Sequence, residues 1–240
     1  MDSQSAQTRE ILLEELVAAN HILSHLRVID AYGHISARDP EHADRYWISR
    51  AMPAHEVSRE TLVEVTLEGA PVRETQAKLF FERVIHGEIY RARPDVNAVI
   101  HAHSPNLIPF CNSATLLRPM TAPAAFLGAG APAFDSRDVD DEGDLNVVTP
   151  AQGRALAQAL GDHALVLLRR HGVVVVGANL REMTRRAVVA EANAQQQLQA
   201  SVLGPVQFLT EAEIEHRRKG SRDPDRAWNA WLQEARAARR

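Results

Sequence analysis

Hydrophobic residues near the start of the chain recur at helical spacing. Apolar side chains from Ile11 to Leu26 fall every three or four residues, which predicts an amphipathic helix over about residues 6–26. From residue 32 to residue 67 the pattern changes to short apolar segments separated by polar turns, which is typical of a strand-rich region. The candidate strands are residues 33–38, 46–49 and 62–66.

The middle of the chain predicts a helix followed by buried strands. Residues 74–90 are expected to be helical, with their apolar side chains, Phe81 among them, on one stripe. A strand over residues 96–100 then leads directly into His101-Ala102-His103. Two further strands within residues 165–177 flank a His-Gly pair. These patterns indicate a sheet whose central strands carry histidines.

Polar capping residues mark the starts of three helices in the second half of the chain. Thr149 predicts a helix to about residue 160, and Asn179 predicts a long helix to about residue 203. Thr210 with Glu213 forms a capping-box pattern that opens a last helix, which runs to about residue 236 with a break at Gly220-Ser221. The whole pattern predicts a single α/β domain, with helices packed on a central sheet.

Composition and charge narrow the class of protein. The chain has 240 residues, of which 45% are hydrophobic and 24% are charged, and this suffices for one sizeable core. The net charge of -4 comes from 27 basic and 31 acidic residues that are mixed along the chain, so neither nucleic acid nor a membrane is an expected partner. The chain has a single cysteine, Cys111, which excludes an internal disulfide. We expect Cys111 to be a small core residue of a protein in a reducing compartment. With neither a signal-peptide pattern nor a long apolar span, a cytoplasmic protein is expected.

The most informative motif is the His-x-His at the end of the strand over residues 96–100. Alternate strand residues share a face and lie about 6.6 Å apart, so His101 and His103 can bind one metal ion. Catalytic sites of the zinc type commonly use three protein ligands. His171 is the best third candidate, because Gly172 beside it allows a close approach of the backbone. For each histidine the alternative is a hydrogen-bonded core residue.

The spacing around this motif excludes two other metal folds. A cupin would have a glutamate a few residues after His103, and a metallo-β-lactamase would have an aspartate two residues after it. Here Ser104-Pro105-Asn106-Leu107 follows.

Three segments together resemble the class II aldolase/adducin family of metal-dependent lyases. They are Gly33-His34-Ile35-Ser36, the stretch from Tyr90 to Pro105, and Arg170-His171-Gly172, and their order and spacing agree from about Glu10 to Leu203. The resemblance implies one class II aldolase-like domain over residues 1–240, with a central, mainly antiparallel or mixed β-sheet flanked by α-helices and a C-terminal helical extension over residues 205–240. It also implies a homo-oligomer, typically a tetramer.

The resemblance assigns roles to four residues. His101, His103 and His171 become the ligands of a divalent metal ion, which could be zinc, manganese, iron or cobalt. The family places a catalytic acid eight residues before the tyrosine, and here that residue is Glu82. Periodicity alone does not exclude Glu74 or Glu88 as the catalytic acid. It also allows Glu82 to be a surface residue that pairs with Arg83 or His86 on a helix. The choice of Glu82 therefore depends on the resemblance. His86 is expected to be structural or to support a ligand.

Departures from the sugar-phosphate aldolases bear on the substrate. Those enzymes share a Gly-Asn-x-Ser turn and a Ser-Ser pair before the acid, whereas this chain has His34 and Phe80-Phe81 there. A phosphate loses hydrogen-bond donors by that exchange, and a flat apolar substrate gains contact surface. The segments Asp30 to Arg38, Ile48-Ser49-Arg50 and Glu82 to Tyr90 look more like the branch that decarboxylates hydroxylated aromatic or pyridine dicarboxylates.

The resulting hypothesis is a metal-dependent lyase that decarboxylates an ortho-hydroxylated aromatic or heteroaromatic carboxylate. The ring would be protonated at the carbon that bears the carboxylate, and Glu82 or His34 would supply the proton. The candidate substrate-binding residues are Ser36, Arg38, Ser49, Arg50 and Phe81. The alternatives are an aldolase or epimerase acting on a sugar phosphate, such as fuculose 1-phosphate or ribulose phosphate, and a non-catalytic adducin-like interaction module.

Overall fold

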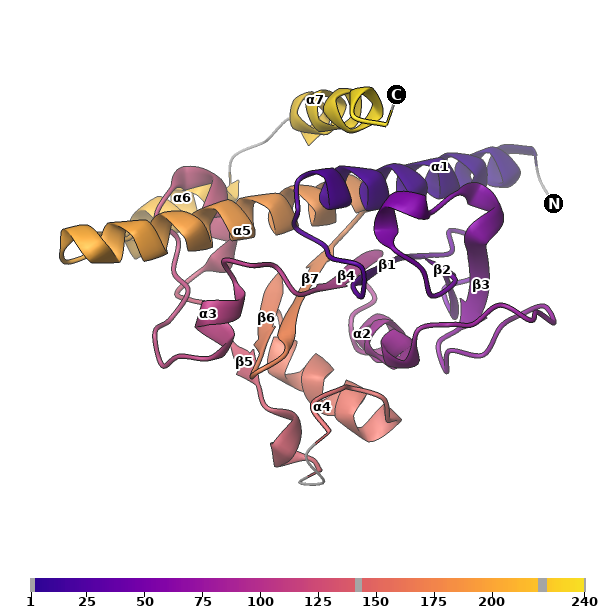
Figure 1. Ribbon diagram of the computed structural model, residues 1–240, viewed down its shortest axis with the longest axis horizontal. Coiled ribbons are helices and arrows are strands. Elements are labelled where there is room, and N and C mark those ends of the chain that lie inside the picture. Colours follow the sequence, from indigo (N-terminus) through magenta and orange to yellow (C-terminus); the bar gives the residue numbers. More distant parts are fainter. Residues whose placement is uncertain (1–2, 141–143, 220–223, 240) are drawn as a thin grey trace.

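The structure is a computed structural model that describes residues 3–140, 144–219 and 224–239. Within these residues seven strands form one sheet in the order β3-β2-β1-β4-β7-β6-β5 (Figure 1). Neighbouring strands run antiparallel, apart from the parallel pair β5 and β6, so the sheet is mixed. This arrangement confirms the predicted α/β domain with a mainly antiparallel or mixed sheet. The strands are β1 (His34–Arg38), β2 (Arg45–Ser49), β3 (Leu62–Thr66), β4 (Ala98–Ala102), β5 (Ala133–Phe134), β6 (Leu165–Leu168) and β7 (Gly172–Gly177).

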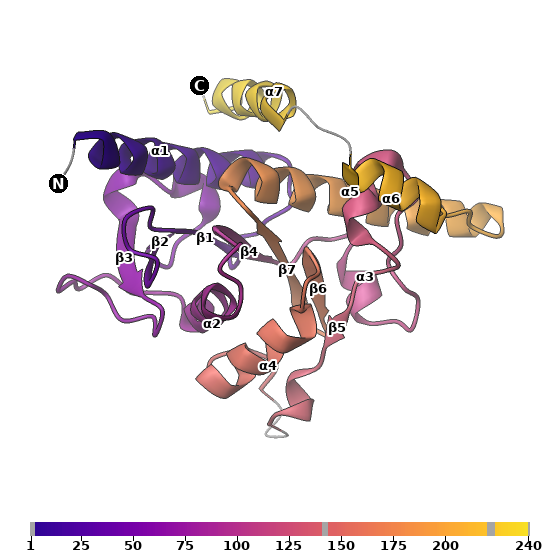
Figure 2. The same cartoon turned by 180° about the vertical axis from the view of Figure 1, so that it is seen from behind.

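Helices cover both faces of the sheet and create two hydrophobic cores. The long helices α1 and α5 pack on one face and α7 lies over α1, while α2 and α4 pack on the other face (Figure 1 and Figure 2). Strand residues alternate between the two cores: Ile100 of β4 faces α1 and α5, and Val99 faces α2 and α4. The helices are α1 (Ser3–His25), α2 (Val84–Ala92), α3 (Ile108–Cys111), α4 (Pro150–Leu160), α5 (Leu180–Leu203), α6 (Glu211–Lys219) and α7 (Pro224–Ala237).

The predicted capping residues form their capping hydrogen bonds at the starts of helices, as expected. Thr149 accepts a hydrogen bond from the amide of Gln152 and opens α4, and Asn179 accepts one from the amide of Glu182 and opens α5. Thr210 and Glu213 bond reciprocally before α6. The expected break at residues 220–221 lies outside the described residues.

The predicted helix over residues 74–90 is wrong in its first part. Helix α2 begins only at Val84, after a single 3-10 turn over Phe81–Arg83, and residues 74–80 form neither helix nor strand. Glu82 consequently lies in the turn that enters the helix, and not in the middle of a helix as the sequence pattern suggested.

Tertiary contacts explain why this segment is not helical. The main-chain carbonyl of Lys78 accepts a hydrogen bond from the amide of Ala51 at 2.7 Å, across to the residues that follow β2. Phe80 takes extended backbone angles, and its ring centroid lies 4.6 Å from that of His34. These contacts outweigh local helix propensity.

Two other expectations concern the core. Cys111 is buried, and its thiol contacts the carbonyl oxygen of Gly172 at 3.1 Å, as expected of a small core residue. Trp228 of α7 is 3% exposed and Trp231 packs against the same core, so core packing accounts for both rings. Within the described ranges, every helix is too short or too polar to span a membrane.

Candidate metal centre

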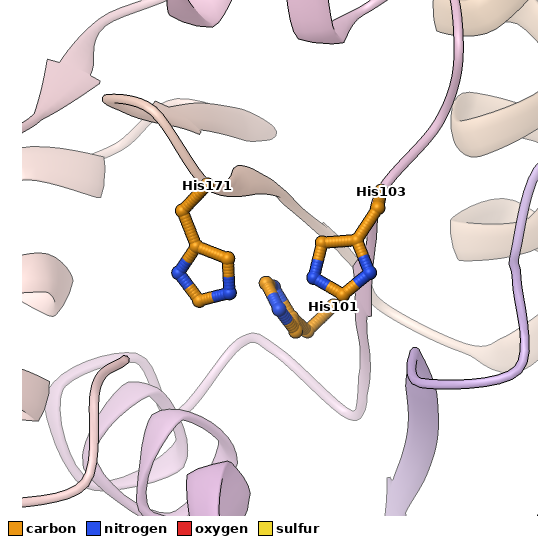
Figure 3. Close-up of side chains that lie close together, drawn as sticks. All are labelled: His101, His103 and His171. Atoms are coloured by element: carbon orange, nitrogen blue, oxygen red, sulfur yellow. The ribbon is translucent and has the colours of Figure 1, made fainter. Parts of the chain in front are cut away.

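Three histidine side chains turn toward one another at one end of β4 and β7 (Figure 3). His101 belongs to β4, His103 follows that strand directly, and His171 lies in the turn between β6 and β7. One nitrogen of each ring lies within 4.8 Å of a nitrogen of both other rings. The fold therefore brings together the three side chains that the sequence singled out, although 68 positions separate His103 from His171.

Hydrogen-bond acceptors hold the outer nitrogens of two of these rings. Nδ1 of His101 lies 3.2 Å from the carbonyl oxygen of Val173, and Nδ1 of His103 lies 3.0 and 3.1 Å from the carboxylate oxygens of Asp30. Each ring thus keeps its proton on Nδ1 and presents a bare Nε2. Nε2 of His101 is buried and has no hydrogen-bond partner in the described part of the chain. Such an arrangement fits a divalent metal ion, because metal-bound histidines usually donate their other N–H to a carboxylate or carbonyl.

Gly172 allows β7 to pass close to the histidine cluster. A Cβ atom at this position would lie 2.6 Å from the carbonyl oxygen of Ala102 and 2.9 Å from Cδ2 of His103. The close approach expected from the His-Gly pair is therefore confirmed. Arg170, on the other side of His171, has a positive φ of 59°, and its guanidinium contacts Asp135 at 2.6 Å.

Glu82 places a carboxylate against the cluster. Its Oε2 lies 3.5 Å from Nε2 of His101 and 3.5 Å from Nε2 of His171, while its Oε1 accepts a hydrogen bond from the amide of Val147 at 2.8 Å. Burial raises the pKa of Glu82, but the contacts with His171 and His101 and the Val147 amide outweigh it and lower the pKa to about 2. The carboxylate is therefore ionised near neutral pH and can bind a metal ion or accept a proton.

The two rival glutamates lie elsewhere. Glu88 is buried against α4, with Arg91 and Arg154 as its ionic neighbours. Glu74 lines a surface groove together with Arg9, and the histidine cluster contributes nothing to that groove. Of these carboxylates, only Glu82 contacts the candidate metal centre.

His34 lies beside the cluster on the neighbouring strand. Strands β1 and β4 pair His34 with His101, and their ring centroids are 5.2 Å apart. Nδ1 of His34 lies 2.6 Å from Nε2 of His86, and its Nε2 is buried without a partner among the described side chains. The structure thus places His34 at the site, as expected, and gives His86 the supporting position that the sequence suggested.

Two predicted substrate-binding residues are already engaged within the protein. The Ser36 hydroxyl lies 2.6 Å from Nδ1 of His86 and 2.8 Å from the hydroxyl of Tyr90, behind His34. Arg38 stacks over the ring of Tyr90 and donates hydrogen bonds to four main-chain carbonyls. Those carbonyls belong to Ala43, Tyr90, Arg93 and Val96. This geometry argues against direct substrate contacts, because the polar groups of both side chains already form hydrogen bonds within the protein.

The other three predicted substrate-binding residues are placed differently from one another. Ser49 is buried at the end of β2, and Arg50 after it is exposed and lines the surface groove that also includes Arg9. Phe81 is 72% exposed, and Phe80 is the phenyl ring that contacts His34. The geometry therefore argues against a substrate contact of Phe81 within one chain and favours Phe80, which the sequence pattern did not separate from its neighbour.

Sequence reasoning assigned no role to Asp30 or Tyr90, although both lie inside the segments that carry the resemblance. The role of Asp30 had a local signal, since an aspartate three residues before a glycine often caps a turn, and Asp30 does accept the amide of Gly33. Its contact with His103 and the contact of Tyr90 with Ser36 depend on how strands far apart in sequence pair, which local patterns do not reveal.

The fold and this site define a class of protein. Residues 14–198 match the family described as Class II Aldolase and Adducin N-terminal domain, so the chain belongs to the class II aldolase and adducin family. Members of this family typically depend on a divalent metal, and the three-histidine cluster is a suitable place for one.

The relatives include decarboxylases, and an aldolase shares the fold. The chain is 32% identical to the decarboxylase tropJ of Talaromyces stipitatus, in an alignment that covers 93% of this chain and 94% of that protein. It is 29% identical to the 3,4-dihydroxyphthalate decarboxylase of Arthrobacter keyseri, covering 80% and 79% of the two chains. The structure of L-fuculose 1-phosphate aldolase from Glaciozyma antarctica PI12 superposes with a TM-score of 0.81 at 20% identity, covering 99% of this chain and 93% of that one, which shows a shared fold.

Proposed function

We propose that the protein is a metal-dependent carboxy-lyase that removes carbon dioxide from an ortho-hydroxylated aromatic or heteroaromatic carboxylate. The observation that carries the proposal is the position of Glu82, whose Oε2 lies 3.5 Å from Nε2 of both His101 and His171. The site therefore combines a place for a cation with an acid–base group that faces it. Similarity to a 3,4-dihydroxyphthalate decarboxylase supports this chemistry over sugar-phosphate cleavage.

The histidine cluster would hold the cation. His101, His103 and His171 offer three imidazole nitrogens, a ligand set that suits zinc, manganese, iron or cobalt. When bound there, the ion supplies Lewis acidity that draws electron density from the oxygen substituents of the substrate ring.

Glu82 is proposed to move the proton. Its Oε1 accepts the Val147 amide, so Oε2 is the oxygen that faces the histidine cluster and a substrate bound there. An ionised Oε2 takes the proton of the ring hydroxyl and delivers it to the ring carbon that bears the carboxylate. The bond from that carbon to the carboxylate then breaks, its electron pair restores the aromatic ring, and carbon dioxide leaves. The ring oxygen regains a proton from water as the product departs, so the reaction consumes one proton per carboxylate lost.

The surroundings of His34 support an aromatic substrate. The Phe80 ring lies 4.6 Å from the His34 ring, where the aldolase pattern would have serine hydroxyls that bind a phosphate. A flat ring gains contact surface with Phe80, whereas a phosphate group there would lack donors.

The deciding experiment offers the purified protein two kinds of substrate. Protein loaded with zinc, manganese, iron(II) or cobalt is incubated with 3,4-dihydroxyphthalate and, separately, with fuculose 1-phosphate. We expect carbon dioxide from the first and no aldehyde from the second. Lactaldehyde released from fuculose 1-phosphate, without carbon dioxide from the phthalate, would instead identify an aldolase.

The proposal includes a cytoplasmic homo-oligomer. Phe81, next to Glu82, exposes 72% of its surface in a single chain, and a second subunit packed over this position would cover the ring. The buried free thiol of Cys111 suits the reducing conditions of the cytoplasm. Light scattering of the purified protein tests the assembly, and a monomer at micromolar concentration would contradict it.

A further inference from the structure

Four buried side chains form a hydrogen-bonded chain behind the candidate metal centre. His34 contacts His86 at 2.6 Å, His86 contacts the Ser36 hydroxyl at 2.6 Å, and that hydroxyl contacts the Tyr90 hydroxyl at 2.8 Å. Each of the four residues is at most 2% exposed. Because bulk water does not reach these groups, each link depends on the protons that the neighbouring side chains supply.

Both rings of the chain are neutral in this environment. Both rings are buried, and Nδ1 of His34 faces Nε2 of His86 at 2.6 Å, where two fully protonated rings would set one N–H donor against another. A neutral imidazole has one protonated nitrogen, which donates, and one bare nitrogen, which accepts. A single proton therefore lies between Nδ1 of His34 and Nε2 of His86. Donation along the hydrogen-bonded chain can consequently run either from Tyr90 toward His34 or from His34 toward Tyr90.

The Tyr90 hydroxyl decides between these directions. Burial raises the pKa of Tyr90, so the phenol keeps its proton and needs an acceptor. Among the residues that the structure describes, the Ser36 oxygen is the acceptor it contacts, since the neighbouring Val99 amide is itself a donor. Ser36 then donates to Nδ1 of His86, and His86 donates from Nε2 to Nδ1 of His34. In the opposite direction His86 would donate to Ser36, and either the phenol proton or the Ser36 hydroxyl proton would be buried without an acceptor among the described residues, which is unfavourable.

The chosen direction leaves the proton of His34 on Nε2. That nitrogen is buried and has no partner within the described ranges. The pairing of β1 with β4 sets the His34 ring 5.2 Å from the His101 ring, and Phe80 covers it at 4.6 Å. His34 consequently presents an N–H donor beside the histidine cluster.

We propose that Tyr90, Ser36 and His86 are positioning residues that lock His34 as an Nε2–H hydrogen-bond donor to an anionic oxygen of the substrate. The identity of that substrate rests on the proposed function, whereas the direction of the chain does not depend on it. A neutral imidazole that gave up its proton would become an imidazolate, so His34 holds a carboxylate or phenolate in place and Glu82 carries the proton. The fixed donor thus selects substrates with an anionic oxygen beside their metal-binding group.

Nitrogen-15 NMR of histidine-labelled protein reads the position of the proton directly, because protonated and bare ring nitrogens have well-separated chemical shifts. Signals of His34 are assigned by their disappearance in the His34→Gln variant. In the metal-free wild-type protein we expect a protonated Nε2 and a bare Nδ1. A protonated Nδ1, or an even mixture of both forms, overturns the proposal whether or not the protein is a decarboxylase.

Two variants of equal size test whether the chain sets this state. Ser36→Asp can only accept from His86 and should reverse the chain, whereas Ser36→Asn can still donate and should preserve it. We expect His34 to carry its proton on Nδ1 in S36D and on Nε2 in S36N. The KM for 3,4-dihydroxyphthalate should be about 10- to 100-fold higher in S36D than in S36N, with equal zinc affinity.

The same His34 proton position in both variants would overturn the role of the chain. If neither variant folds, the wild-type spectrum decides alone. If the wild-type spectrum shows the expected state but 3,4-dihydroxyphthalate is not turned over, the proposed function fails and the direction of the chain stands.

Discussion

The carboxylate of Asp30 lies 3.0 and 3.1 Å from Nδ1 of His103, on the side of the ring that faces away from the other two histidines. The Oδ1 atom of Asp30 also accepts the amides of Tyr32 and Gly33, in the turn that leads into β1. One side chain thus orients a candidate metal ligand and shapes the entry to the strand that carries His34.

We expect the Asp30→Asn variant to bind zinc about 10- to 100-fold more weakly than the wild type, because a charged partner of a ligand is lost. Asparagine retains an oxygen for the two amides, so the free energy of unfolding should change little. Competition with a chromogenic chelator measures the zinc affinity. Asp95→Asn is the control, since Asp95 is exposed and pairs with Arg93. Equal zinc affinity of D30N and D95N would contradict the supporting role of Asp30.

Replacing Glu82 by glutamine separates proton transfer from folding. Glutamine keeps the oxygen that accepts the Val147 amide but cannot carry a proton, so kcat should fall by about 10²- to 10⁴-fold. The zinc content should stay close to that of the wild type, because three histidines remain. Glu88→Gln is the matched control, as Glu88 lies against α4. Wild-type turnover in E82Q would remove Glu82 from the mechanism.

Gly172→Ala should disturb the histidine cluster through steric overlap. The added methyl group would meet the Ala102 carbonyl and His103, at a cost of about 1–3 kcal/mol and with weaker zinc binding. Gly128 is a useful comparison, because its φ is +61° and no other atom lies within 4 Å of an added Cβ. Because φ of +61° with ψ of -137° is a conformation that essentially only glycine adopts, the G128A variant should lose about 1–3 kcal/mol through backbone strain but bind zinc normally. Isothermal titration calorimetry checks both variants, and unchanged zinc affinity in G172A would refute the steric argument.

The sequence predicted the three-histidine cluster because its local signals are strong. A His-x-His after an apolar strand fixes two side chains on one face, and Gly172 marks the place where the backbone approaches them. The starts of α4 and α5 were equally predictable from the sequence, since Thr149 and Asn179 are caps whose effect is confined to one turn.

The surroundings that the sequence does not predict depend on contacts between distant segments. Glu82 was placed in a helix because residues 74–90 have a helical apolar pattern, but the contact of Phe80 with His34 holds part of that segment extended. Arg38 was expected to face the substrate because a guanidinium suits a carboxylate. Its engagement with main-chain carbonyls depends on where α2 ends relative to β1, which spacing along the chain does not fix.

Asp39 offers a test of stability that is independent of the metal centre. Its side chain is fully buried and accepts hydrogen bonds from Arg9 at 2.9 Å and from the Trp47 indole at 2.8 Å. Burial raises the pKa of Asp39, but the bonds from Arg9 and Trp47 outweigh it, so the pKa lies below the ordinary value of 3.8. Because the folded state has the lower pKa, the ionised form contributes stability above pH about 3.8 that is lost as the pH falls through the folded-state pKa.

We therefore expect the Asp39→Asn variant to be about 1.5–3 kcal/mol less stable than the wild type at pH 7, since a hydrogen-bonded buried charge is removed. The difference should shrink once the pH falls below about 3.8, where Asp39 of the unfolded wild-type chain begins to bind a proton while that of the folded protein is still ionised. Urea unfolding of both proteins at pH 7, 5, 4 and 3.5 or lower measures the gap. Asp44→Asn, at an exposed position, should match the wild type throughout. A gap between D39N and wild type that stays constant as the wild type is acidified would show that the Asp39 charge contributes nothing to stability.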